Sequence, residues 1–299
     1  MGTNLSCLAA ILVIASGCQN ILGIEDVEGR ADASGGTGPG TSADASGTGS
    51  GGGADASIGE DARPSDTEIE WVEFSGGTFL RGSDDDDASL NESPVHEVEL
   101  SAFSLAETET SVAQYEACVD AGECDEPSTG GSCNWGISDR DNHPINCVSW
   151  FDAQDFCEFV DGRLPTEAER EYAATSGGRD WKFPWGDEDA TCERAVMSDA
   201  GENGCGEDGT WPVCSKPAGH SEQGICDLAG NVWEWVYDWH GDYEEGSHVD
   251  PKGPESGSDR VLRGGSGNVV ARHLRASNRA YGDPSASYGD LGFRCARSP

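Results

Sequence analysis

The chain is 299 residues long and carries 18 lysines and arginines against 56 aspartates and glutamates, a formal charge of −38. So acidic a surface repels the phosphates of nucleic acids and anionic lipid headgroups, which argues against a nucleic-acid partner. It favours cations instead, calcium among them. The length alone allows one or two domains, but the composition changes along the chain and divides it unevenly.

Residues 1–17 predict a signal peptide for export. The apolar run from Leu8 to Ala15 is too short to span a membrane but suits a secretion signal. The sequence ASGC at 15–18 is similar to a bacterial lipobox, in which the cysteine, here Cys18, receives a lipid and becomes the mature N-terminus. The alternatives are a signal that is cleaved without lipidation and myristoylation of the opening Met-Gly.

Residues 18–69 predict a flexible, acidic tether. Gly, Ser, Ala, Thr and Asp dominate this segment, and almost nothing apolar follows Ile24. Such a composition cannot bury a core. Gln19, rather than an aspartate, follows the lipidated cysteine, which in some bacteria directs lipoproteins to the outer membrane. We therefore expect an outer-membrane lipoprotein that touches the membrane through its N-terminal lipid only.

From about Ile69 the sequence is typical of a folded domain, which we place at residues 70–299. Aromatic residues and leucines recur between turn residues, and about 230 residues suffice for one large core. IEWVEF and TFLRGS, separated by residues 75–77, predict a β-hairpin. The alternating stretch VHEVELSAFSL at 95–105 predicts further strand.

Three helices are predicted from their N-terminal caps. The first begins at residues 110–111, and the second is capped by Ser149 and ends at Gly162. In LPTEAEREYAA, Thr166 and Glu169 form a capping box for the third. The C-terminal half predicts turns and short strands. The fold class is therefore α+β, irregular and loop-rich.

Twelve cysteines are present, of which ten follow the signal. An even number in an exported chain predicts disulfides. The absence of Cys-x-x-Cys and the irregular spacings argue against zinc. Cys118 and Cys124 are close enough in sequence to pair across a helix end, whereas spacing leaves the full set of pairings open. If all ten pair, no free thiol remains as a nucleophile.

Five motifs in one order resemble the formylglycine-generating enzyme, or sulfatase-modifying factor, family over residues 70–299. The motifs are NCVSWFDAQDFCEFVDGRLPTEAEREYAA (146–174), FPWGD (183–187), GICDLAGNVWEWVYDW (224–239), RVLRGGS (260–266) and LGFRCAR (291–297). The resemblance implies a large, irregular C-type-lectin-like α+β fold stapled by disulfides. It also implies that Cys157 pairs with Cys295.

The resemblance implies a structural calcium ion in the loop DLAGNVWEW. Carried over residue by residue, the ligands are Asp227, Gly230, Val232 and Glu234. Carboxylates and carbonyl oxygens suit calcium, although these acids can also be turn and surface residues. A second family site matches residues 193–208. Cys192 and Cys205 lie at this stretch where metal ligands would be expected, so we expect disulfides rather than an ion to hold the loop. The aspartates at 84–87 predict a solvated loop.

The resemblance also bears on copper. In the active enzyme the segment after RGGS carries two cysteines that bind copper(I) and oxidise a substrate cysteine to formylglycine. Here that segment is GNVVARHLRASNRAYGD, and no cysteine lies in residues 227–294. Copper(I) needs soft thiolate ligands, which Val269 and Leu274 cannot supply. We therefore expect that the protein binds no copper and has no formylglycine-generating activity. Whether it has another enzymatic activity is an open question.

Other catalytic arrangements are weakly indicated. Ser266 is not in a Gly-x-Ser-x-Gly elbow, and His273 is the only imidazole of its segment. A relative of the family forms carbon–sulfur bonds with non-haem iron, using histidines of an added N-terminal helical domain. This chain has the tether there, and His96 and His143 form no paired ligand pattern.

Three functions stay open. We favour a module that binds a peptide, protein or glycan in the family's cleft. The cleft residues expected are Trp233, Arg263, Ser266, Arg275, Arg279 and Asp290. The three arginines can pair with a ligand carboxylate or sulfate, or neutralise neighbours such as Asp283 and Asp290. An enzyme with altered chemistry and a structural cell-envelope protein are the alternatives.

Overall fold

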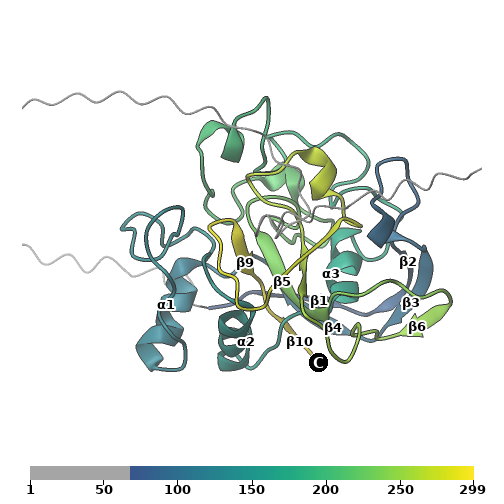
Figure 1. Ribbon diagram of the computed structural model, residues 1–299, viewed down its shortest axis with the longest axis horizontal. Helices are drawn as coiled ribbons and strands as arrows, with labels where there is room; N and C mark the ends of the chain where they lie inside the picture. Colours follow the sequence, from purple (N-terminus) through teal and green to yellow (C-terminus); the bar gives the residue numbers. More distant parts are fainter. Residues whose placement is uncertain (1–67) are drawn as a thin grey trace, which may run out of the picture.

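The computed structural model describes residues 68–299. The predicted signal, Cys18 and nearly all of the tether lie outside the described residues. Three helices and three small sheets are joined by long loops (Figure 1). This arrangement confirms the irregular, loop-rich α+β class. Within the described residues, no helix has the length and apolar character needed to cross a bilayer.

The three helices begin at the predicted caps. They are α1 (Val112–Ala121), α2 (Trp150–Phe159) and α3 (Glu167–Ala174). Ser111, Ser149 and Thr166 each accept the backbone N–H of the third helical residue in a capping box, which satisfies an amide that the helix leaves unpaired.

Helix α2 ends earlier than predicted. Its last residue is Phe159, not Gly162. The chain then turns tightly, and the amide of Gly162 donates to the carbonyl of Cys157 at 2.7 Å. A Cβ at Gly162 would lie 2.7 Å from the carbonyl oxygen of Ala296. The glycine is therefore needed for the close approach of the C-terminal strand rather than as the helix terminus.

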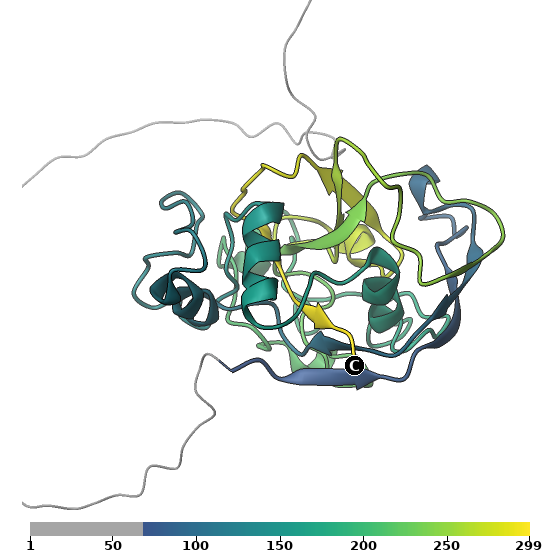
Figure 2. The same ribbon diagram turned by 90° about the horizontal axis from the view of Figure 1, so that it is seen from below.

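Each sheet combines strands from distant parts of the chain (Figures 1 and 2). The first contains β1 (Trp71–Phe74), β4 (Phe103–Ala106) and β10 (Ala296–Arg297). The second contains β2 (Gly77–Arg81), β3 (His96–Leu100) and β6 (Ser247–Val249). The third has the order β8 (Arg279–Gly282), β7 (Arg260–Arg263), β5 (Trp233–Trp239) and β9 (Leu291–Phe293).

The predicted hairpin of the first two strands is wrong. β1 pairs with β4 and β2 pairs with β3, so the chain crosses from one sheet to another at Gly76. A Cβ at Gly76 would lie 2.2 Å from the carbonyl oxygen of Leu100, which leaves room for glycine only. Each strand is held by a different aromatic contact. The ring of Phe74 stacks on that of Phe103 with 4.9 Å between centroids, and the ring of Phe79 packs against that of Tyr172 with 5.3 Å between centroids.

Helix α3 lies between the sheets and is buried on every side (Figure 1). Its apolar residues Ala168, Tyr172 and Ala173 pack on β1 to β4. Its charged residues are ion-paired, as Arg170 is with Glu234 of β5 at 2.7 Å. A buried charge is tolerated only when it is paired. Helix α3 therefore ties the sheets together through charges as well as packing.

Every cysteine within residues 68–299 is half of a disulfide. The five pairs are Cys118–Cys124, Cys133–Cys147, Cys157–Cys295, Cys192–Cys205 and Cys214–Cys226. The pairing that spacing favoured, the pairing that the resemblance implied and the disulfide expected in the 193–208 region are all present. Cys157–Cys295 ties helix α2 to the end of the chain across 138 residues.

Candidate functional site

The turn after β7 directs a serine into the protein. Gly264 and Gly265 have φ values of +94° and +75°, which glycine adopts far more readily than other residues. A Cβ at Gly265 would also lie 2.6 Å from Cδ2 of Leu274. Ser266 follows and is completely buried. The two glycines are therefore required by the turn that positions Ser266.

Ser266 is hydrogen-bonded to the acid that precedes β9. Its hydroxyl donates to Oδ2 of Asp290 at 3.2 Å and accepts the backbone N–H of Asn268 at 3.3 Å. Burial raises the pKa of Asp290, and the bond from Ser266 offsets part of that increase. Two of the predicted cleft residues thus lie together, with Ser266 behind Asp290.

A cavity of about 430 Å³ opens in front of this pair. Three loops line it, residues 131–140, 203–210 and 267–268, together with Asn231 and the segment 289–290. Amides, a hydroxyl, a guanidinium and two carboxylates supply most of its polar groups, from Asn134, Arg140, Asp208, Thr210, Asn231, Asn268 and Asp290. Convergent polar groups in a concave site of this size are typical of ligand binding.

One wall of the cavity is a hydrogen-bonded loop that the sequence analysis missed. Asn134 and His143 lie between Cys133 and Cys147, whose disulfide closes this loop. The amide of Asn134 donates to Thr210 Oγ1 at 3.0 Å, and His143 Nδ1 lies 2.9 Å from the same oxygen. In the sequence, polar residues between Cys133 and Cys147 could have indicated this wall. The sequence did not show that these two cysteines pair.

The two apolar residues that the sequence analysis named after the RGGS turn are buried. Val269 and Leu274 belong to the main hydrophobic core. The carbonyl of Val269 accepts the amide of Ser198 at 2.9 Å, so the loop is fixed by the backbone as well. All ten cysteines of the described chain are in disulfides, so none of them is a free thiol there.

The arginines predicted for the cleft are buried in ion pairs with glutamates. Arg263 pairs with Glu171, and Arg279 pairs with Glu167 at 2.6 Å. Arg275 pairs with Glu92 at 2.6 Å. The counter-ions are thus not the suggested Asp283 and Asp290, of which the first is bound to Ser285. None of these arginines lines the cavity beside Asp290, and Trp233 is a core residue.

The predicted calcium loop contains one saturated carboxylate. Glu234 accepts two hydrogen bonds from Arg170, at 2.7 and 2.9 Å, and two from Arg294, at 2.8 and 2.9 Å. A carboxylate has about four lone-pair positions, so these bonds leave Glu234 none for a metal. Asp227 has a different environment, since its Oδ2 accepts only the amide of Cys214 in the described structure.

A third buried carboxylate, Glu109, faces this loop and was not predicted. It accepts the side-chain amide of Asn231 and the backbone N–H of Val232 at 3.2 Å. Burial, with the charges of Asp227 and Glu234, raises the pKa of Glu109 well above its ordinary value. Three carboxyl groups therefore meet two arginines here, so their full ionisation leaves one buried negative charge in excess, which either a proton on Glu109 or a bound cation would neutralise. Such an excess fits a cation held by Asp227 and the carbonyls of Gly230 and Val232.

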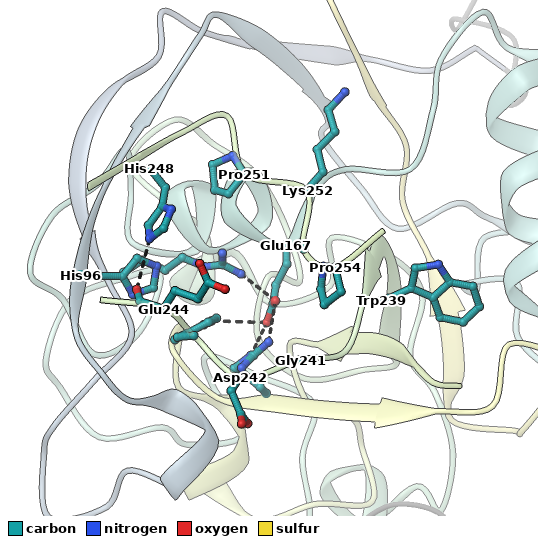
Figure 3. Close-up of a pocket in the computed structure, with 14 residues that line it drawn as sticks. His96, Glu167, Trp239, Gly241, Asp242, Glu244, His248, Pro251, Lys252 and Pro254 are labelled. Atoms are coloured by element: carbon teal, nitrogen blue, oxygen red, sulfur yellow. Dashed lines mark hydrogen bonds and ion pairs between the residues drawn. The ribbon is translucent and has the colours of Figure 1, made fainter. Parts of the chain in front are cut away.

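A second cavity, of about 290 Å³, lies between β3, β8 and the loop after β5 (Figure 3). Its floor is the ion pair of Glu167 with Arg81 and Arg279. The ring of Tyr243 lies between the two guanidinium groups, 4.4 Å from one and 3.9 Å from the other. Glu167 and Glu171 together pair with Arg81, Arg263 and Arg279, so every charged group of this floor has a partner of opposite charge and the floor belongs to the scaffold.

Comparisons with known proteins place these features in a family. Residues 56–299 match the sulfatase-modifying factor enzyme 1-like domain. The formylglycine-generating enzyme of Streptomyces coelicolor is 34% identical, in an alignment that spans 81% of this chain and 93% of that protein. Hercynine oxygenase of Mycolicibacterium thermoresistibile is 31% identical over 69% of this chain and 53% of its own length.

A solved structure shows the same fold. Variable protein 1 of Treponema denticola superposes with a TM-score of 0.63 and 26% identity, covering 77% of this chain and 95% of that one. The match of the family domain extends through every described sheet and helix, including the RGGS turn and the disulfide-closed C-terminus. The chain therefore belongs to the sulfatase-modifying factor enzyme 1-like, or formylglycine-generating enzyme, family.

Proposed function

We propose that the protein is an exported, lipid-anchored binding module that takes a peptide-like ligand in the cavity beside Asp290 and does not oxidise it. One observation carries the proposal. The cavity is open and lined by polar groups, while every cysteine of the described chain is held in a disulfide. A recognition site is present without the thiolates that copper(I) chemistry requires.

The lining suits the backbone of an extended peptide. The exposed amide of Asn268 offers a donor and an acceptor, and the carboxylates of Asp208 and Asp290 offer further acceptors. Asn231 is fixed, because its oxygen accepts the amide of Trp211 at 2.9 Å and its nitrogen donates to Glu109. Groups held in place before binding lose little freedom when a ligand arrives.

The five disulfides support an oxidising location outside the cytosol. Lipidation at Cys18 and residence at the outer membrane belong to the proposal and rest on the sequence of residues 1–19. Mass spectrometry of the purified exported chain tests this part, since a lipidated Cys18 would be the first residue of the mature protein.

An enzyme with altered chemistry is the second candidate, because relatives in this family carry enzyme names. Ser266 is paired with a carboxylate rather than an imidazole, and the ring of His273 accepts from its neighbour Arg272 at 3.0 Å. A Ser-His pair is therefore not assembled in the described residues. These contacts favour binding over hydrolysis.

We also propose a structural calcium ion at the loop beneath the cavity. Asp227 and the carbonyl oxygens of Gly230 and Val232 would hold it. Glu234 would serve as the counter-ion of Arg170 and Arg294 instead of as a ligand. The excess negative charge around Glu109 supports this assignment.

Two assays on the purified full chain test the proposed function. In the first, the chain is incubated with copper(I), oxygen and a peptide containing Cys-x-Pro-x-Arg, and mass spectrometry follows the peptide's cysteine. We expect no formylglycine, and turnover would overturn the proposal.

In the second assay, random tetrapeptides are passed over the immobilised wild-type chain and over the Asn268→Trp variant, in which the larger side chain fills the cavity from an exposed position. We expect the wild type to retain peptides and the Asn268→Trp variant not to. Equal retention by the two proteins would refute binding in the cavity.

A further inference from the structure

We infer that Arg140 is the anchor for a carboxylate group of the ligand, so that the cavity selects peptides with a free C-terminus or an acidic side chain. This inference rests on the proposed function and names the ligand class for the same cavity. It follows from three features of the structure: the missing counter-ion of Arg140, the way its guanidinium is held, and the acceptors that share its cavity.

Arg140 differs from the buried arginines in its partners. Six of the seven arginines that are buried in the described chain are ion-paired with a glutamate: Arg81, Arg170, Arg263, Arg275, Arg279 and Arg294. The seventh, Arg260, donates to the carbonyl of Tyr237 and stacks on the rings of Trp150 and Trp239. Within residues 68–299, Arg140 has no carboxylate partner, although the chain carries an excess of 38 negative charges. It is half-buried and lines the cavity. Its charge is therefore available to an incoming anion.

The guanidinium is fixed through a single nitrogen. Nη1 lies 3.1 Å from Asn134 Oδ1, 3.2 Å from Thr210 Oγ1 and 3.3 Å from His143 Nδ1. In the described structure neither Nε nor Nη2 has a hydrogen-bond partner. A guanidinium held at one corner presents its remaining N–H groups as a fork, which is the geometry that binds both oxygens of a carboxylate.

His143 keeps this arrangement intact at neutral pH. Burial, with the adjacent charge of Arg140, lowers the pKa of His143 to about 4. The ring is therefore neutral near pH 7, and its Nδ1 can accept a hydrogen bond from the guanidinium. A neutral neighbour adds no competing charge to the site. The neutral His143 therefore holds the guanidinium of Arg140 in place without weakening its attraction for an anion.

Acceptors line the remainder of the same cavity. Asp290 and Asp208 contribute carboxylates, and Asn231 and Asn268 contribute amide oxygens. These groups favour N–H donors and repel a second anion. A ligand that places a carboxylate at Arg140 and peptide or amine N–H groups toward Asp290 satisfies both the guanidinium and the acceptors. A polyanion, such as a sulfated glycan, would satisfy only Arg140.

The test uses the immobilised full chain and three pools of tetrapeptides that otherwise lack acidic residues. The first pool has free C-termini, the second has amidated C-termini, and the third is amidated but contains one Asp or Glu. Affinity selection with mass spectrometry measures retention. We expect the wild type to retain the first or third pool at least about tenfold better than the second, which is typical of a charge-assisted hydrogen-bonded pair. The better of the two identifies the source of the carboxylate.

Variants separate recognition from folding. Arg140→Gln should abolish the preference for carboxylates, whereas Arg140→Lys should retain part of it, since lysine keeps the charge without the fork. Arg179→Gln is the matched control, because Arg179 is exposed and paired with Glu222 away from the cavity. Thermal unfolding of each variant verifies the fold.

The outcomes distinguish the two proposals. Equal retention of the three pools, abolished by Asn268→Trp but unchanged by Arg140→Gln, would overturn the role of Arg140 and leave cavity binding intact. No retention of any pool by the wild type would overturn the proposed function itself. A preference for carboxylates that survives Arg140→Gln would assign the anion to another residue.

Discussion

Glu234 and Arg294 form a bidentate ion pair in the interior, with Nη2–Oε1 and Nε–Oε2 distances of 2.8 and 2.9 Å. Arg170 occupies the other side of the same carboxylate. The pair joins β5, which contains Glu234, to the residue that follows β9, and both side chains are at most 1% exposed. These two segments are thus coupled through a charge that has no access to water.

Arg294→Met should lower the free energy of unfolding by about 3–5 kcal/mol, because Glu234 would lose one of its two buried partners. Guanidinium unfolding of the full chain measures the change. Arg179→Gln removes an exposed ion pair instead and should cost less than about 1 kcal/mol. Equal costs for the two variants would show that burial does not set the strength of the Glu234 cluster.

Removing the Cys157–Cys295 disulfide should destabilise the protein more than removing Cys118–Cys124. The first closes a loop of 138 residues and the second a loop of six. Chain entropy then gives about 5 and about 2 kcal/mol, respectively. Double alanine variants of each pair, compared in denaturant titrations, measure the difference. A larger loss from the short loop would mean that native contacts, not chain entropy, dominate.

Calcium should raise the melting temperature of the wild type saturably, by an amount that corresponds to about 2.7 kcal/mol at a hundredfold excess over the dissociation constant. Asp227→Asn should abolish the shift, since it removes the proposed carboxylate ligand. Glu234→Gln should destabilise the chain to a similar extent with or without calcium, because Glu234 supports Arg170 and Arg294. Absence of any shift in the wild type would refute the site.

Asp238 should make the protein less stable as pH rises from about 4 to 8. Burial, and then the charge of Glu167, raise the pKa of Asp238 to about 7. Between the unfolded and folded pKa values the native chain keeps a proton that the unfolded chain releases. The stability that this proton contributes is present near pH 4 and is lost as pH passes 7.

Asp238→Asn cannot ionise, and its side-chain oxygen can still accept the amide of Glu167, as Asp238 does at 2.8 Å. Urea unfolding at pH 4.5 and pH 8 gives the free energy of the wild type relative to this variant. We expect the relative stability of the wild type to fall by about 3 kcal/mol over that interval. A pH-independent difference would contradict a raised pKa for Asp238.

Local signals in the sequence were sufficient for the helices. Ser111, Ser149 and Thr166 are each followed by a residue that completes a capping box, and a cap depends only on neighbours in the chain. The strands were harder to place, because pairing depends on distant partners. Residues 75–77 contain a plausible turn, yet the aromatic contacts of Phe74 and Phe79 draw β1 and β2 into different sheets.

The candidate site was predicted in part. The sequence analysis named both Ser266 and Asp290 as cleft residues, and their contact depends on the RGGS turn and on the residue that precedes β9. The role of the arginines was open, because a sequence does not show which acid faces which base. Arg140 and Asn134 were missed because their loop becomes a cavity wall only once the Cys133–Cys147 disulfide is formed.

The disulfide between Cys157 and Cys295 also determines what a protease can do to this protein. All peptide bonds between these two residues lie inside one covalent ring. A single cut within the ring, for instance in an exposed loop near Glu245, opens the chain without releasing a fragment. The nicked molecule gains only the one water that hydrolysis adds, and its two pieces stay joined through the disulfide. The folded domain would thus survive its first cleavage within the ring as one molecule.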